Sequence, residues 1–277
     1  MKRILLMAVA MVAIFFQGQA KTENEIKLIS YNIRTAWGRD GNNSWDYRKT
    51  ATSGLFQKES PDVIGLQEAM KCQLDYIDYT CPEYAHVGED RDGGIEGGET
   101  MAIYYRKEKF DLLDHGTFWL SESPDIVSRG WDAACNRTVT WVKLKLKGNN
   151  KSFYYFNTHL DHVSDEARIK GIDVVLDKIA QFGGLPAVIM GDLNAEEGSA
   201  TIDAALEHFL DARYEARETM DSYTFQSWGD MEKACRIDYF MLSKTGFAVH
   251  SYQALIEPYD GIYSSDHSPI VLKISMK

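Results

Sequence analysis

Several apolar segments of this sequence end or begin with side chains that can bind a cation or move a proton. They are Asn32, Glu68, His159, Asp192 with Asn194, Asp238, and Asp266 with His267. Neighbouring residues inside a strand point to opposite faces, whereas at a strand end both can reach one cavity. One polar strand end is ordinary loop chemistry. Six of them predict that the strand ends converge on a single polar site.

The segments that must position these residues alternate between strand-like and helix-like patterns. We expect strands at 26–34, 62–68, 100–107, 137–146, 151–160, 185–195, 236–244, 247–256 and 268–277. We expect helices at 44–60, 164–184 and 199–210. Strand-rich halves with interspersed helices predict two sheets packed together, with the helices outside.

Six short motifs resemble those of the endonuclease/exonuclease/phosphatase superfamily. In chain order they are SYNIR, GLQE, NTHLDH, GDLNA, RIDYF and SDHSPI. Each is weak alone, but GDLNA followed by SDH, with LQE upstream, is highly specific. The resemblance implies an α/β fold, a four-layer αββα sandwich of two packed mixed β-sheets flanked by helices. It also implies a site at one edge of the sheets and Mg²⁺ or Mn²⁺ as cofactor.

Glu68 is the first expected metal ligand. It ends a buried strand, where an unpaired carboxylate is costly unless a cation or hydrogen-bond donors meet it. Hard divalent cations accept carboxylate oxygens. The superfamily resemblance supports the same role, with Asn32 and Asp266 as further ligands from the same pocket. A strand-end glutamate facing solvent would explain Glu68 if it stood alone.

His267 is the expected general base, because an imidazole can take a proton from water near neutral pH when another group orients it. The resemblance implies that Asp238 is this orienting carboxylate. It also implies that Asp192 and Asn194 align the attacking water and bind the phosphoryl group. Asp192 is therefore an alternative base, and a simple Asx turn is the alternative explanation of GDLNA.

The remaining predicted site residues would contact the substrate phosphate. His159, in NTHLDH, matches the superfamily's phosphate-contacting histidine, and Asn194 would share this role. Arg137 offers a planar donor suited to phosphate, although a surface ion pair would explain it equally well. Asp161 and His162 are expected to support these residues. Trp37, Trp45, Trp119 and Trp131 could stack on a base, sugar or headgroup, or serve only in packing.

The N-terminus has the features of a cleaved signal peptide at 1–20. Lys2 and Arg3 precede an apolar run at 4–16, followed by the small residues Gly18 and Ala20. The run is shorter than the roughly 20 residues of a membrane span, so we expect export to the periplasm or the medium without stable membrane insertion. Residues 21–277 are expected to form a single catalytic domain and a monomer.

Charge and cysteine content bound the function further. The net charge of −11 disfavours avid, non-specific binding of long nucleic acids, although a local basic groove could coexist with it. In an exported protein the four cysteines could form two disulfides. Cys72 with Cys81 is the nearest pair and Cys135 with Cys235 the second, while buried free thiols are the alternative.

The leading hypothesis is an exported, Mg²⁺- or Mn²⁺-dependent phosphoesterase that uses activated water on a phosphodiester or phosphate monoester. One alternative is a nuclease, either deadenylase-like (a 3′-exonuclease) or DNase-like, acting on RNA or DNA. Others are a sphingomyelinase-like enzyme and an inositol-phosphate phosphatase. A non-catalytic binding protein on the same fold would predict a substituted metal or base position. Here all of these positions keep their expected residues.

Overall fold

The computed structural model describes residues 24–94, 97–220 and 222–277. The signal peptide expected at 1–20 lies outside these ranges. Within them, no helix combines the length and the apolar character needed to cross a bilayer.

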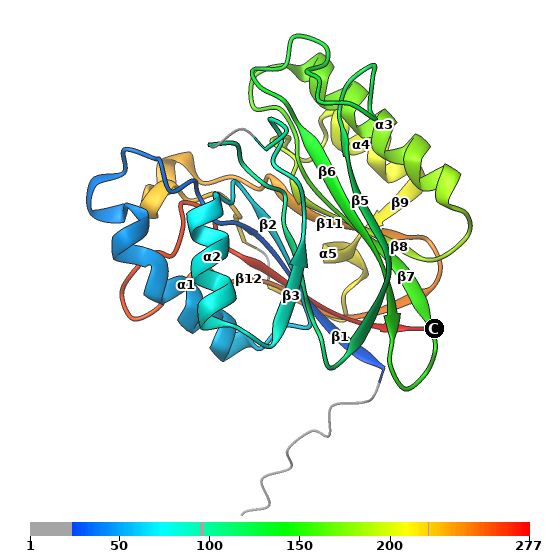
Figure 1. Ribbon diagram of the computed structural model, residues 1–277, viewed down its shortest axis with the longest axis horizontal. Coiled ribbons are helices and arrows are strands. Elements are labelled where there is room, and N and C mark those ends of the chain that lie inside the picture. Colours follow the sequence, from blue (N-terminus) through cyan, green and yellow to red (C-terminus); the bar gives the residue numbers. More distant parts are fainter. Residues whose placement is uncertain (1–23, 95–96, 221) are drawn as a thin grey trace, which may run out of the picture.

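Two β-sheets form the centre of the molecule (Figure 1). The first contains β1 (Glu25–Asn32), β2 (Val63–Gln67), β3 (Tyr84–Val87), β4 (Ile103–Arg106), β10 (Glu218–Met220), β12 (Phe247–Ala254) and β13 (Ile270–Met276). The second contains β5 (Phe110–Trp119), β6 (Thr138–Leu146), β7 (Ser152–His159), β8 (Ala187–Asp192), β9 (Phe209–Asp211) and β11 (Asp238–Ser243). The strand orders are β10-β12-β13-β1-β2-β4-β3 and β5-β6-β7-β8-β11-β9.

Helices cover the outer face of each sheet (Figure 1). The helices are α1 (Trp45–Glu59), α2 (Lys71–Thr80), α3 (Asp165–Phe182), α4 (Ala200–His208) and the short α5 (Ala212–Glu215). Short 3-10 turns lie at η1 (Gly41–Asn43), η2 (Ser227–Gly229) and η3 (Met231–Lys233). Apolar residues of α1 and α2 pack on the seven-stranded sheet, and those of α3 and α4 on the six-stranded sheet. This confirms the four-layer αββα arrangement of two mixed sheets.

The main apolar core lies between the sheets. Ile26 and Leu28 of β1 share this cluster with Val188 and Met190 of β8, and all four side chains are fully buried. Ile29, next to Leu28 on β1, instead packs under the outer helices. This alternation is the two-residue period of a strand whose two faces are both covered.

Strand direction explains why the predicted polar residues meet. β1 and β2 are parallel with Asn32 opposite Gln67, so Asn32 and Glu68 emerge at the same edge. β13 is antiparallel to β1 and pairs Ile270 with Ser30, so the residues that precede β13 reach that edge too. In the other sheet β7 and β8 are parallel and β11 is antiparallel, so the ends of β7 and β8 meet the start of β11.

Several elements were not expected from the sequence: the short β3, β9, β10 and α5, and the longer α2 and β5. The helix α2 was not expected because its sequence, KCQLDYIDYT, is rich in residues with weak helix propensity. The strand β5 was not expected because Gly116 and several charged residues interrupt its pattern, and its register shifts between Leu112 and Asp114. Trp119, expected near a loop, is the last residue of this strand.

Neither of the two disulfides considered from the sequence is present among the described residues, in which all four cysteines are free, as in the alternative. Cys72 is exposed in the first turn of α2, whereas Cys81 is buried just beyond its last turn. At about 1.5 Å per residue, the helix holds the two Cα atoms roughly 13 Å apart, beyond the reach of a disulfide. Cys135 and Cys235 are also free, and both are half-buried.

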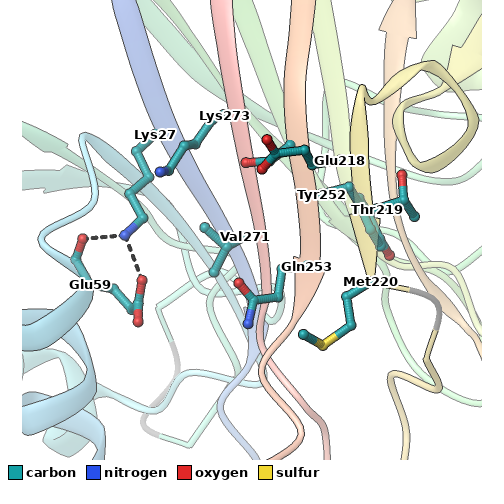
Figure 2. A pocket seen from close by; sticks show the side chains of 10 residues that line it. Lys27, Glu59, Glu218, Thr219, Met220, Tyr252, Gln253, Val271 and Lys273 are labelled. Atoms are coloured by element: carbon teal, nitrogen blue, oxygen red, sulfur yellow. Dashed lines mark hydrogen bonds and ion pairs between the residues drawn. The ribbon is translucent and has the colours of Figure 1, made fainter. Parts of the chain in front are cut away.

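A hollow of about 360 Å³ lies on the outer face of the seven-stranded sheet, beside α1 (Figure 2). On one side of it, Lys27 donates to the carbonyl and carboxylate oxygens of Glu59 at 2.6 and 2.5 Å. Glu218 and Met220 of the edge strand β10 lie on the opposite side. No histidine is among the described residues that line this hollow, and its lysine–glutamate pair ties β1 to α1. It is therefore a poor candidate for acid–base chemistry.

A buried polar contact joins the two sheets near the edge where the strand ends meet. Asn157 of β7 donates to the carbonyl oxygens of Leu66 and Ala102, at 2.8 and 2.9 Å. Its own side-chain oxygen accepts a hydrogen bond from the Gln67 amide at 2.7 Å. Both side chains are fully buried, so this contact fixes how the sheets meet two residues before His159.

Asn157→Ala should lower the free energy of unfolding by about 3 kcal/mol, because it removes a partner from the Gln67 amide and from buried carbonyl groups. Chemical denaturation measures this change. Asn42→Ala, at an exposed position in η1, is the control and should stay within about 0.5 kcal/mol of the parent. A loss below about 1 kcal/mol for Asn157→Ala would mean that the Asn157 contact contributes little to joining the sheets.

Candidate active site

The edge where the strand ends meet holds a cavity of about 500 Å³. The predicted site residues that line it are Glu68, Arg137, His159, Asp192, Asn194, Asp266 and His267. The other two, Asn32 and Asp238, are buried and hydrogen-bond to residues of this wall. The structure therefore brings the whole predicted set together.

Three of these residues occupy one rung of the six-stranded sheet. Asp192 on β8 pairs with His159 on β7 and with Asp238 on β11. Paired residues project from the same face of a sheet, so the rung aims one imidazole and two carboxylates in one direction. His159 Nε2 lies 3.4 Å from an Asp192 oxygen. Burial lowers the pKa of His159 well below its ordinary value, so this ring is neutral.

His267 is held between the two carboxylates of that rung. Its Nδ1 lies 2.9 Å from Asp238 Oδ2, and its Nε2 lies 3.6 Å from Asp192 Oδ2. The ring of Phe225 packs against the imidazole, with 5.0 Å between the centroids. Burial lowers the pKa of His267, but the charges of Asp238 and Asp192 outweigh it and raise the pKa to about 10. The two carboxylates therefore favour the protonated, imidazolium form of His267.

Asn32 links the two sides of the cavity. Its Nδ2 donates to Glu68 Oε1 and to Asp192 Oδ2, both at 3.0 Å. Its Oδ1 accepts a hydrogen bond from the backbone amide of Arg34, also at 3.0 Å. The amide therefore fixes one carboxylate from each sheet relative to the other.

Glu68 and Asp266 have the donor atoms that a hard divalent cation requires. The guanidinium of Arg34 lies 4.0 Å from Glu68 Oε2 and 3.8 Å from Asp266 Oδ2. Burial raises the pKa of Asp266, and the charge of Glu68 raises it further. The half-buried carboxylate of Glu68 and the buried one of Asp266 repel each other and would be stabilised by a divalent cation, so this pair fits Mg²⁺ or Mn²⁺.

A second group able to hold a cation comprises Asp192, Asp238 and His267, whose ligand atoms lie within 4.8 Å of one another. Asp238 and His267 are already hydrogen-bonded to each other at 2.9 Å, and an ion at this group would have to compete with that bond. Glu68 and Asp266 offer only oxygen donors, which Mg²⁺ prefers. We therefore regard them as the better magnesium site.

Arg137 is fixed by residues that the NTHLDH motif contributes. Its Nε lies 3.3 Å from Asp161 Oδ2, and its Nη2 lies 2.8 Å from His162 Nδ1. Three backbone amides donate to Asp161 and hold that carboxylate in place. The guanidinium is thus a preorganised donor in the cavity wall rather than a mobile surface cation.

Asp192 and Asn194 form a tight turn after β8. The Asn194 backbone amide donates to Asp192 Oδ1 at 2.9 Å, and its side-chain amide donates to the Leu160 carbonyl oxygen at 3.0 Å. The Asx turn considered as the alternative explanation is thus present. It coexists with the functional arrangement, because the same turn holds both side chains at the cavity.

Three residues of the cavity wall have a left-handed backbone: Arg34 at φ 57°, Glu68 at φ 59° and Asn194 at φ 46°. Each follows the end of β1, β2 or β8 by one or two residues. This conformation is unfavourable for a residue with a Cβ atom, by about 1 kcal/mol or more. Here it turns the chain sharply at the strand end, so that the side chain enters the cavity.

Sequence analysis did not predict two charged residues of the cavity wall, Arg91 and Glu99. They belong to the glycine- and acid-rich segment between β3 and β4 and form an ion pair at 2.5 Å. Trp119 Nε1 donates to the Arg91 carbonyl oxygen at 2.7 Å and anchors this segment. The other lining residues outside the predicted catalytic, metal-binding and phosphate-binding set are Arg34, Thr35, Cys135, His162, Phe225, Cys235 and Ile237. No strand-end pattern marks Arg91 and Glu99.

Burial raises the pKa of Glu99 from 4.5 to about 7, the charge of Glu68 adds to this, and Arg91 and Arg137 oppose it. The folded protein therefore binds this proton more tightly than the unfolded chain does. Between pH 4.5 and about pH 7, the contribution of Glu99 to the free energy of unfolding therefore falls as the pH rises.

Glu99→Gln should remove this contribution, so the stability lost between pH 5 and pH 8 should shrink by on the order of 2 kcal/mol. Urea denaturation in EDTA at both pH values measures the difference. Glu83→Gln, at an exposed position, is the matched control. An equal loss in the Glu99→Gln variant and the parent would contradict the buried-acid assignment.

The comparisons with known proteins agree with the motifs. The sequence profile of the Endonuclease/Exonuclease/phosphatase family matches residues 29–267. A solved endonuclease/exonuclease/phosphatase from Bacteroides vulgatus is 33% identical, with a TM-score of 0.87, covering 91% of this chain and 99% of its own. A mannosyl-6-phosphatase from Bacteroides thetaiotaomicron is 31% identical, with a TM-score of 0.84 and the same coverage of 91% and 99%.

A curated relative extends the likeness to a virus. An uncharacterised protein of Acanthamoeba polyphaga mimivirus is 24% identical over 246 residues, which cover 82% of this chain and 91% of that protein. The family profile spans the chain from β1 to His267, and the two bacterial structures match nearly all of the fold. The chain therefore belongs to the Endonuclease/Exonuclease/phosphatase family.

Proposed function

We propose that this protein is a metal-dependent phosphoesterase that hydrolyses a P–O bond of a phosphate ester with activated water. Members of its family are phosphoesterase hydrolases. The observation that carries the proposal is the Asn32 amide, which hydrogen-bonds both Glu68 and Asp192. Glu68, which would bind the cation, and Asp192, which would accept a proton, are thereby held on either side of the Asn32 amide. The His267–Asp238 pair lies beside them.

Asp192 is the group best placed to take the proton of the attacking water. Burial and the charge of Asp238 raise the pKa of Asp192 to about 7, which makes it a stronger base than an exposed carboxylate. His267 already carries a proton and suits the role of donor to a phosphoryl oxygen, with Asp238 keeping it charged and oriented. Of the two bases that the sequence left open, these surroundings favour Asp192.

The remaining wall supplies the groups that phosphoryl transfer needs. Negative charge develops on the equatorial oxygens, and Arg137, Asn194 and His159 lie in the wall that would face them. A magnesium or manganese ion held by Glu68 and Asp266 would act as a Lewis acid on the phosphoryl and leaving oxygens. Asn32 orients Glu68 for this role through its amide.

We further propose that the substrate is a phosphate monoester of a sugar. A relative 31% identical over nearly the whole fold is a mannosyl-6-phosphatase. Arg34, Arg91 and Arg137 line the cavity and suit the double negative charge of a terminal phosphate. The acidic chain, with a net charge of −11, is poorly suited to gripping a long polyanion. We also propose that the protein is exported to the periplasm or the medium and that it is a monomer.

The second candidate function is cleavage of RNA or DNA, which the same three arginines would favour. A substrate panel with magnesium decides between them, using mannose 6-phosphate, bis-para-nitrophenyl phosphate, oligonucleotides, sphingomyelin and inositol phosphates. We expect kcat/KM for mannose 6-phosphate to exceed that for any diester by at least about tenfold, because a dianion meets more of the arginine charge. An oligonucleotide that reacts faster would replace the monoester assignment with a nuclease.

Glu68→Gln and His267→Gln should each lower kcat by at least about 100-fold, because one weakens the cation site and the other removes a charged donor. EDTA should abolish the activity of the parent, and added Mg²⁺ or Mn²⁺ should restore it. Steady-state kinetics and thermal unfolding together check these outcomes, with Glu83→Gln as control. Parent-like activity of a folded Glu68→Gln variant, or activity that survives EDTA, would refute the proposed role of a bound metal ion in catalysis.

A further inference from the structure

A second cavity, of about 480 Å³, adjoins the one that holds the catalytic groups. Its volume lies within the range of small-molecule sites in proteins. The residues that give it chemical character are Trp37, Met70, Asp75 and Asp90. None of them has a role in the mechanism proposed above.

The two cavities share a wall, because four short chain segments line both. The pairs are Thr35 and Trp37, Glu68 and Met70, Arg91 and Asp90, and Glu99 and Thr100, with the first of each pair in the catalytic cavity. Backbone hydrogen bonds join these segments: the Thr100 amide donates to the Ala69 carbonyl oxygen at 2.8 Å. The Arg91 amide donates to the Glu99 carbonyl oxygen at 3.0 Å. The two cavities therefore lie side by side, and a ligand that occupied both would cross this wall.

The shared wall lies on the side toward which a leaving group would depart. In-line displacement places the attacking water and the leaving oxygen on opposite sides of phosphorus. The two candidate bases for the attacking water, Asp192 and His267, lie 3.6 Å apart on one side, and the Asn32 amide lies between Asp192 and Glu68. The leaving oxygen therefore lies on the side of Glu68, which belongs to the shared wall.

The second cavity has the chemistry of a site for a neutral, polyhydroxylated ring. The Trp37 side chain is 66% exposed and rests on Gly97, where an added Cβ would lie 2.4 Å from the indole ring. An exposed indole face can stack on the apolar face of a sugar, and the carboxylates of Asp75 and Asp90 can accept hydrogen bonds from hydroxyl groups. Lys71 of the same wall is paired with Asp75 at 2.7 Å, so the wall offers little positive charge to a second phosphate.

We propose that this cavity is the subsite for the sugar ring of the leaving group, with Trp37 as the stacking platform. The inference rests on the proposed phosphatase function and extends it to the part of the substrate that is not phosphate. The subsite would select a pyranose leaving group over an acyclic one. The catalytic groups would act on both.

Trp37→Ala should raise KM for mannose 6-phosphate roughly three- to tenfold and leave kcat within about twofold, because a stacking face is lost and the reacting groups are untouched. KM for glycerol 3-phosphate, which has no ring, should not change. Trp37→Phe should recover most of the loss. Tyr47→Ala, at a 63% exposed aromatic of α1 that lines neither cavity, is the control.

A binding measurement without turnover separates this inference from the proposed function. Saturation-transfer NMR with methyl α-mannoside should detect the ring protons bound to the parent and not to Trp37→Ala. Hydrolysis of mannose 6-phosphate with an unchanged KM in Trp37→Ala would refute the subsite and leave the phosphatase standing. Mannoside binding that depends on Trp37, without hydrolysis of any phosphate monoester, would uphold the sugar site and refute the phosphatase. Preferential binding of adenosine at Trp37 would overturn the sugar assignment.

Discussion

The hydrogen bonds of the Asn32 side chain are the contacts on which the geometry of the site depends. Asn32 ends a strand of one sheet, Asp192 ends a strand of the other, and the amide also holds Glu68. The separation of the two carboxylates is therefore set by how the sheets pack, not by loop conformation. Asn157 bridges the same pair of sheets close by. A site built on strand ends in this way inherits the rigidity of the core.

Charge is concentrated in this cavity far beyond what an apolar core tolerates. Asp192, Asp238 and Asp266 are buried around a single imidazolium, His267, whose pKa they raise together. Carboxylates packed so closely destabilise one another, and burial raises the pKa of Asp192 and Asp266 as well. A divalent cation would offset this excess of negative charge, and the phosphate of a substrate would then meet the arginines of the wall. Destabilisation of this kind is expected at a functional site, because catalysis needs groups whose pKa values are shifted from their ordinary values.

The sequence predicted the strand ends well because an apolar run that stops at a carboxylate or an imidazole is a local signal. Residues that lack such a local signal could not be predicted in this way. Arg91 and Glu99 come from a glycine-rich segment with no periodicity, so only the tertiary fold brings them to the cavity. The sequence left a Cys72–Cys81 bridge and free thiols both open, because the weak helix propensity of α2 hid the helix that holds the two residues apart. The orientation of an amide is likewise invisible in sequence, so the linking role of Asn32 required coordinates.

The left-handed backbone of Glu68 has a consequence for how such proteins diverge. Glycine at position 68 would relieve the local strain and could make the fold slightly more robust. Selection for thermal stability alone should therefore favour glycine at position 68. The protein would become more stable and would lose its catalytic activity. A relative that has become an inert binding scaffold should show the same replacement, since only the hydrogen bonds from Asn32 and Thr35 would then favour an acidic residue in this strained conformation. The residue at position 68 should therefore indicate whether a relative is still an enzyme.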